Sequence, residues 1–207
     1  WAEVWGARLQ AWRDALLHNT LPFHLGDSGA MRSPSDRYFA VPDMVTSPQV
    51  LLLRWLEVGP YSLVNALLLF TVGTLSLLAV RKRFSLSLFA YAVLFLTFHF
   101  NGFVVTHFSI GHLSWGGYYF FPAFGMLLLE LENGQHDWAW VTRMAVVLFL
   151  MLLQGSFHHF FWCFLLLGSL ALTHWRVAMP ILKAAIATIL LSMGRLLPML
   201  YRFEGLQ

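Results

Sequence analysis

YSLVNALLLFTVGTLSLLAVRKR, residues 61–83, combines the two features that decide the fold of this chain, a long apolar run and three basic residues at its end. About 20 apolar residues in a helix are enough to cross the roughly 30 Å of hydrocarbon in a bilayer. Lys and Arg concentrate in the cytoplasmic loops of membrane proteins. The stretch therefore predicts a transmembrane helix over 60–80 whose basic end, Arg81, Lys82 and Arg83, lies in the cytoplasm.

The composition of the whole chain agrees with a membrane protein. Of its 207 residues, 58% are hydrophobic and 11% are charged, and the mean hydropathy is +0.66. A soluble domain carries roughly a quarter charged residues, so the composition excludes a water-soluble globular protein. The net charge is +3, but the basic residues are scattered at the ends of apolar runs and form no stripe for phosphates to follow. This distribution excludes nucleic acid as a partner.

Five more apolar runs follow the first, and each approaches the length of a membrane-crossing helix. The run at 115–131 is short, and Pro122 is expected to kink it because proline removes a helical hydrogen bond. We expect an all-α fold, a polytopic integral membrane helix bundle of about six transmembrane helices that forms a single membrane domain over 60–207. The expected spans are 60–80, 85–106, 115–131, 138–155, 157–175 and 177–198.

The loops between these spans predict the orientation of the bundle. If the helices alternate in direction, Arg143, Arg176 and Lys183 lie on the same side as the basic residues after the first span. The opposite short loops, HFSIGH and QGSFHH, contain no Lys or Arg. By the positive-inside rule, these two histidine-bearing loops are extracytoplasmic.

The N-terminal segment, residues 1–59, is then expected to be extracytoplasmic as well. Its first part mixes apolar and charged residues as in a helix that lies along the membrane surface, and 49–58 resembles a second short interfacial helix. Between them, 19–48 is rich in Pro, Gly, Ser and Asp, which predicts an irregular loop. The chain starts at Trp1 and stops without a tail, so we expect it to be an excerpt from a longer polytopic protein.

Ionisable side chains gather on the predicted outer side. Such groups are costly at membrane depth and are candidates for function by default. The candidates are His107 and His112 on one outer turn, His158 and His159 on the next, Arg195 near the outer end of the last span, and Asp27 and Asp43 on the outer N-terminal loop.

Histidine leaves more than one cofactor open. A divalent metal bound by His107 and His112 fits the ligand types, although their HxxxxH spacing crosses a glycine-containing turn. Two haems stacked along the helices are disfavoured, because the 13 residues from His99 to His112 place the two rings about 140° apart around a helix. A single haem or a chlorophyll between the outer turns remains an alternative.

Three stretches together resemble polytopic GT-C-type glycosyltransferases and their uncharacterised bacterial relatives. They are GHLSWGGYYFFPAFGMLLLELENG (111–134), LLQGSFHHFFWCFLLL (152–167) and GRLLPML (194–200). The resemblance implies a bacterial inner (cytoplasmic) membrane location and an acidic catalytic residue in the first extracytoplasmic loop. Asp27, in HLGDSG, is the first match to that acid, and Asp43, in VPD, is the second.

Such an enzyme would transfer a sugar from a polyprenyl-phosphate donor at the extracytoplasmic face, and this lipid-linked sugar would be its main partner. Asp27 would accept the proton of the acceptor hydroxyl, and Arg195 would pair with the donor phosphate. His158 or His159 would also contact the phosphate. Trp115 and Tyr118 would offer an apolar face to the sugar ring or the prenyl chain. His107 and His112 would bind a metal or hydrogen-bond the leaving phosphate.

A second hypothesis assigns the chain to a different class. It is a non-catalytic structural subunit of a membrane complex, or a subunit that binds haem or chlorophyll through an outer histidine, with other membrane subunits and lipids as partners. Nine Trp and nineteen Phe residues suit pigment packing as well as lipid contact. A transporter is disfavoured because no inverted repeat is visible.

Overall fold

A computed structural model describes residues 6–20 and 44–204, and all regular structure in these ranges is helical, which confirms the all-α prediction. The α-helices are α1 (Ala7–Leu17), α2 (Val58–Phe84), α3 (Leu88–His99), α4 (Gly102–Ser109), α5 (Phe121–Glu132), α6 (Trp138–Leu153), α7 (Phe157–Thr173) and α8 (Trp175–Glu204). Three 3-10 helices join them, η3 (Met44–Thr46), η4 (Pro48–Arg54) and η5 (Leu113–Phe120).

Three helical stretches are long and apolar enough to cross a membrane. They are α2, the combined stretch Leu88–Ser109 of α3 and α4, and the Trp175–Leu197 part of α8. Large apolar side chains on these helices face outward, for example Phe89 with 80% of its surface exposed, as expected of residues that contact lipid. Helices α6 and α7 are apolar but shorter, with 16 and 17 residues, so the count of six spans stays a prediction.

The predicted span at 85–106 is interrupted where α3 ends and α4 begins. A broken helix within a bilayer needs other groups to bond the freed backbone atoms. Asn101 caps α4, because its Oδ1 accepts hydrogen bonds from the amides of Phe103 (3.0 Å) and Val104 (3.4 Å). On the other side of the break, the hydroxyl of Tyr118 donates to the carbonyl of Phe98 at 3.1 Å. The chain therefore supplies its own partners at the break.

Tyr118→Phe is expected to destabilise the protein by about 1 kcal/mol, because the Phe98 carbonyl loses its donor next to the break. Tyr91→Phe is the matched control, since no hydrogen bond of its hydroxyl is found among the described residues. Thermal unfolding of the purified protein in detergent measures both. Equal melting temperatures for the two variants would contradict a structural role for the Tyr118 hydroxyl.

The predicted span at 115–131 is divided into η5 and α5. Pro122 lies in the first turn of α5, where its missing N–H has no partner within the helix. The α-helix therefore starts at Phe121, directly after η5, and Pro122 marks the change from 3-10 helix to α-helix.

Two hydrophobic cores hold the helices together. The larger one lies within the bundle, where the fully buried Trp140 of α6 donates its indole N–H to the carbonyl of Leu127 on α5 at 2.8 Å. The smaller one lies beneath α1 and includes Trp12, Leu53 and Tyr61. Because Tyr61 belongs to α2, the N-terminal unit of α1, η3 and η4 packs onto the end of the bundle.

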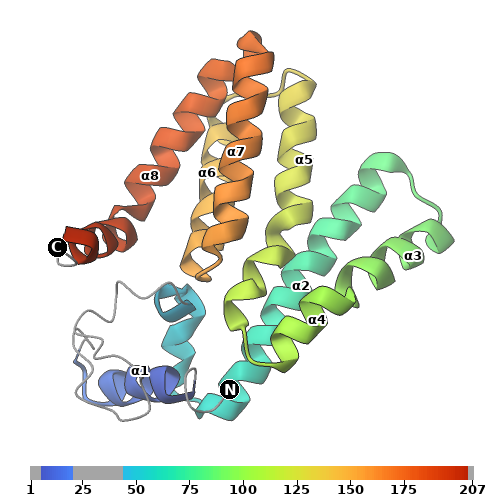
Figure 1. Ribbon diagram of the computed structural model, residues 1–207. Coiled ribbons are helices and arrows are strands. Elements are labelled where there is room, and N and C mark those ends of the chain that lie inside the picture. The colour runs from blue at the N-terminus through green and yellow to red at the C-terminus, as the bar shows by residue number, and fades with distance from the viewer. Residues whose placement is uncertain (1–5, 21–43, 205–207) are drawn as a thin grey trace.

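The helices define two ends of the bundle, which we name the α1 end and the far end. Helix α1 lies across the α1 end, where α2 starts and where the chain turns from α6 into α7 (Figure 1). The end of α2, with Arg81, Lys82 and Arg83, points the other way, as do the α5–α6 loop and the α7–α8 turn (Figure 1). The structure thus separates the basic end of α2 from the two histidine-bearing turns.

Candidate functional site

Four imidazoles and one indole form a continuous group at the α1 end, which we call the imidazole cluster (His107, His112, Trp115, His158 and His159). The ring of His107 stacks on Trp115, with centroids 4.0 Å apart and planes 11° apart. Trp115 in turn lies 4.5 Å from the ring of His158 and 5.0 Å from that of His159. The four histidines of the two turns thus lie in one group, and the extracytoplasmic position of these turns stays a prediction.

His107 and His112 form a close pair within the cluster. Their Nδ1 atoms lie 3.0 Å apart, so in the neutral pair one ring donates an N–H and the other accepts it. Gly111, which precedes His112, has φ of +86°. Glycine adopts this conformation without strain, and the reversal it allows brings His112 back over the end of α4.

The second pair lies in the first turn of α7. His159 is buried, with 2% of its surface exposed, and its Nδ1 has no hydrogen-bond partner in the part of the chain that the structure describes. The same is true of the Nε2 atom of His158. A buried polar atom without a partner costs roughly 1–3 kcal/mol, so these two nitrogens are suited to bind a polar ligand group.

Ser156 locks the two histidine-bearing turns together. Its hydroxyl accepts a hydrogen bond from the amide of Gly117 at 2.8 Å and donates one to the carbonyl of Ser114. A Cβ atom at Gly117 would collide with the side chain of Ser156. Sequence reasoning did not single out Ser156 or Gly117, and the adjacent Gly-Gly of SWGGY and the Gly-Ser of QGSF were the available signals.

Arg195 is buried at the same end of the bundle. Only 2% of its surface is exposed, and it shares one face of α8 with the fully buried Thr188 and Ser192. Its guanidinium carbon lies 6.0 Å from the ring centroid of Phe157, the residue that precedes His158. The arginine therefore lies at the base of α7, on the residue next to the imidazole cluster.

The other predicted site residues have different positions. Tyr118 stacks on Phe98 with centroids 4.4 Å apart, and its hydroxyl is bonded to the carbonyl of Phe98 on α3. Asp27 and Asp43 lie outside the described residues. Among the described residues, no group of three or more His, Cys, Asp or Glu side chains could hold a metal. His107 and His112 alone would supply two of the four ligands of a tetrahedral site.

Comparison with known proteins adds no further assignment. No family model, no curated protein and no solved structure matches the chain.

Proposed function

We propose that the protein is a membrane glycosyltransferase that moves a sugar from a polyprenyl-phosphate donor to an acceptor at the extracytoplasmic membrane face. The observation that supports this proposal is the meeting of the imidazole cluster and the buried Arg195 at one end of an apolar bundle. A polyprenyl phosphate keeps its tail in the bilayer and its phosphate at the membrane surface. Cationic and hydrogen-bonding groups at the end of apolar helices suit that position.

Arg195 and the second histidine pair would bind the donor phosphate. A guanidinium can form two parallel hydrogen bonds with phosphate oxygens. Within the described ranges the Nε2 of His158 and the Nδ1 of His159 have no hydrogen-bond partner, so each can donate to a phosphate oxygen when it carries the proton. These contacts would balance the charge that builds up on the leaving phosphate.

Asp27 would act as the general base. It would take the proton of the acceptor hydroxyl while the acceptor oxygen forms a bond to the anomeric carbon of the sugar. The bond between that carbon and the phosphate oxygen would break, and polyprenyl phosphate would leave with the electron pair. Asp43 is the second candidate for the base.

The first histidine pair and two aromatic side chains would complete the site. His107 and His112 would share a divalent metal through their Nδ1 atoms, with the remaining ligands from the donor, or would bond the leaving phosphate directly. Their 3.0 Å separation is near the spacing of two imidazole nitrogens that each lie about 2.0–2.1 Å from one ion. Trp115 would offer its face to the sugar ring or prenyl chain, and Tyr118 would contribute its ring from the side of α3.

This function requires the α1 end to be extracytoplasmic, in a bacterial inner membrane with six spans. Ser109→Cys, at the α1 end, is expected to react with a membrane-impermeant maleimide added to intact cells. Ser85→Cys, after the basic residues of α2, is expected to react only after the membrane is opened. Both serines are exposed, and the native Cys163 is buried, which keeps the background low. Labelling of Ser85→Cys in intact cells would contradict the proposed orientation.

The activity is tested with the full-length protein in liposomes that contain a radiolabelled polyprenyl-phosphate sugar. Transfer of label to an acceptor, with no visible absorption band in the purified protein, supports the proposal. A Soret or chlorophyll band that His112→Ala removes, without any transfer, would instead identify a haem- or pigment-binding subunit.

A further inference from the structure

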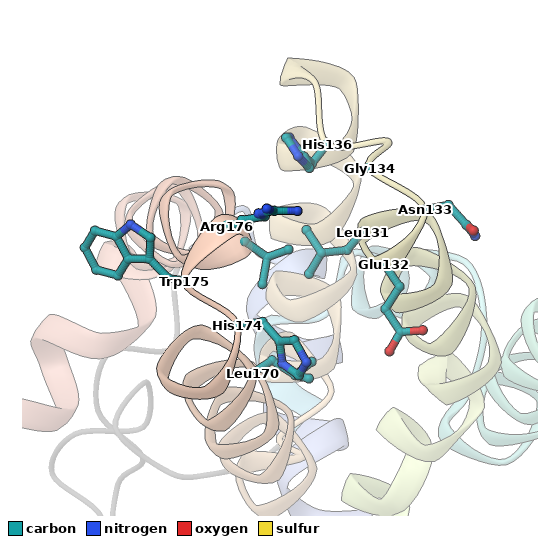
Figure 2. A pocket seen from close by; sticks show the side chains of 10 residues that line it. Leu131, Glu132, Asn133, Gly134, His136, Leu170, His174, Trp175 and Arg176 are labelled. Atoms are coloured by element: carbon teal, nitrogen blue, oxygen red, sulfur yellow. The ribbon is translucent and has the colours of Figure 1, made fainter.

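A large cavity lies at the far end of the bundle, away from the imidazole cluster. Its volume is about 960 Å³, and it opens between the α5–α6 loop and the α7–α8 turn (Figure 2). The lining side chains with polar or aromatic groups that matter here are Glu132, His136, His174, Trp175 and Arg176. The proposed transfer reaction makes no use of this cavity.

The cavity carries one cation and one anion that do not neutralise each other. Arg176 lies in the first turn of α8 and Glu132 is the last residue of α5, and Figure 2 shows their side chains coming from different helices. Among the described residues, the ion pair that is found joins Arg143 to Glu130 at 2.8 Å, and neither Arg176 nor Glu132 takes part in an ion pair or a side-chain hydrogen bond. Each charge is therefore available to a ligand.

Several groups favour a phosphate beside Arg176. His136 and His174 line the same cavity and can donate ring N–H groups to oxygen. The first turn of α8 contains no acidic residue, so the positive end of its helix dipole is uncompensated there. A phosphate near Arg176 would lie at the start of α8, in a cavity that His136 and His174 also line, whereas Glu132 would repel it and attract a cationic group.

The residues around the opening of the cavity favour a lipid as its ligand over a free solute. Trp175 is 86% exposed and Leu172 is 89% exposed, next to the opening. Tryptophan is enriched at the level of the lipid head groups, and an exposed leucine beside it offers a surface for an acyl chain. A ligand with two chains as well as a charged head group would cover both.

We propose that this cavity binds the head group of phosphatidylethanolamine. The phosphate diester lies on Arg176 with His136 and His174, and the ammonium group donates to the carboxylate of Glu132. Phosphatidylcholine presents methyl groups where Glu132 needs a donor, and phosphatidylglycerol has no cation for it. The cavity thus selects the zwitterionic lipid that can satisfy both charges.

Native mass spectrometry of the detergent-purified protein tests the proposal, with phosphatidylethanolamine, phosphatidylcholine and phosphatidylglycerol of identical acyl chains. The wild type is expected to retain phosphatidylethanolamine most. Glu132→Gln is expected to lower its affinity about tenfold without weakening phosphatidylglycerol, because only the ammonium contact is lost. Arg176→Gln is expected to weaken both lipids about tenfold, because both carry the phosphate. Glycerophosphoethanolamine, which lacks acyl chains, is expected to compete poorly.

Arg83→Gln is the control for net charge. Arg83 is exposed at the far end, on α2, and does not line the cavity, so this variant should bind all three lipids like the wild type. Equal retention of the three lipids by the wild type, preference for phosphatidylglycerol, or equal effects of Arg83→Gln and Arg176→Gln would each overturn the proposal. None of these readouts depends on sugar transfer, so failure of the lipid site and failure of the proposed enzyme are distinguishable.

Discussion

Asp27→Asn and Arg195→Ala are each expected to lower sugar transfer at least about 100-fold while the protein still inserts into the membrane. Asparagine keeps the size of aspartate but cannot accept the proton of the acceptor hydroxyl. Alanine at Arg195 removes the guanidinium that would bind the donor phosphate. Initial rates with the radiolabelled donor, normalised to the amount of inserted protein, measure both effects.

Matched variants separate these losses from general damage. Asp14→Asn, on the exposed face of α1, and Arg83→Ala, at the far end, change the same charges elsewhere and should leave transfer unchanged. Arg195→Lys keeps the charge of the buried side chain but not its two-pronged geometry, so it should retain part of the activity. Unimpaired transfer by both Asp27→Asn and Arg195→Ala would refute the residue assignment. Loss of transfer in Asp43→Asn but not in Asp27→Asn would move the base to Asp43.

Gly117→Ala is expected to destabilise the protein by about 3 kcal/mol, because the added methyl group has no room beside Ser156. The obstacle includes the Cβ atom of Ser156, which cannot rotate away as the end of a flexible side chain would. To make space, η5 must move away from the α6–α7 turn, and the hydrogen bond between the Gly117 amide and Ser156 would break. We expect the two histidine pairs to separate as a result, so transfer should fall together with stability.

Two further variants test this interpretation by thermal unfolding. Gly125→Ala lies on α5, where an added Cβ meets nothing within 4 Å, and it should leave stability unchanged or raise it by up to about 1 kcal/mol. Adding Ser156→Gly to Gly117→Ala removes the colliding atoms, so the double variant should be more stable than the sum of the two single changes predicts. Additive effects would show that Ser156 is not the obstacle.

The local pattern of the sequence was enough to predict the class of fold. Runs such as 61–80 are too long and too apolar for a soluble protein, and this property depends on composition alone. The same holds for the grouping of charges at Arg81, Lys82 and Arg83 and for the position of the histidines in the short opposite turns. The hydropathy and length of a segment depend only on its own residues, so these features could be predicted without knowing the tertiary structure.

The breaks and contacts within the predicted spans could be found only in the three-dimensional structure. The break before Asn101 is tolerated because Tyr118, 20 residues from Phe98, supplies a hydroxyl to its carbonyl. Tyr118 was expected to face the substrate, and sequence distance gave no sign of this contact. Pro122 was expected to kink a span, but whether a proline kinks or begins a helix depends on where the helix starts.

Composition and pattern alone predicted an all-helical chain with helices apolar enough to cross a membrane and with four of its histidines in two short turns. That these two turns meet could be learned only from the packing of the helices, because the contact depends on a hydrogen bond between Ser156 and the amide of Gly117, where a side chain would collide with Ser156. The same is true of the free charges of Glu132 and Arg176, which lie 44 positions apart and share a cavity only after α5 and α8 have packed around α6. The preference of a segment for water or lipid depends on its own residues and can be predicted from them. A site depends on the distances between separate segments, and these are set by how the helices pack.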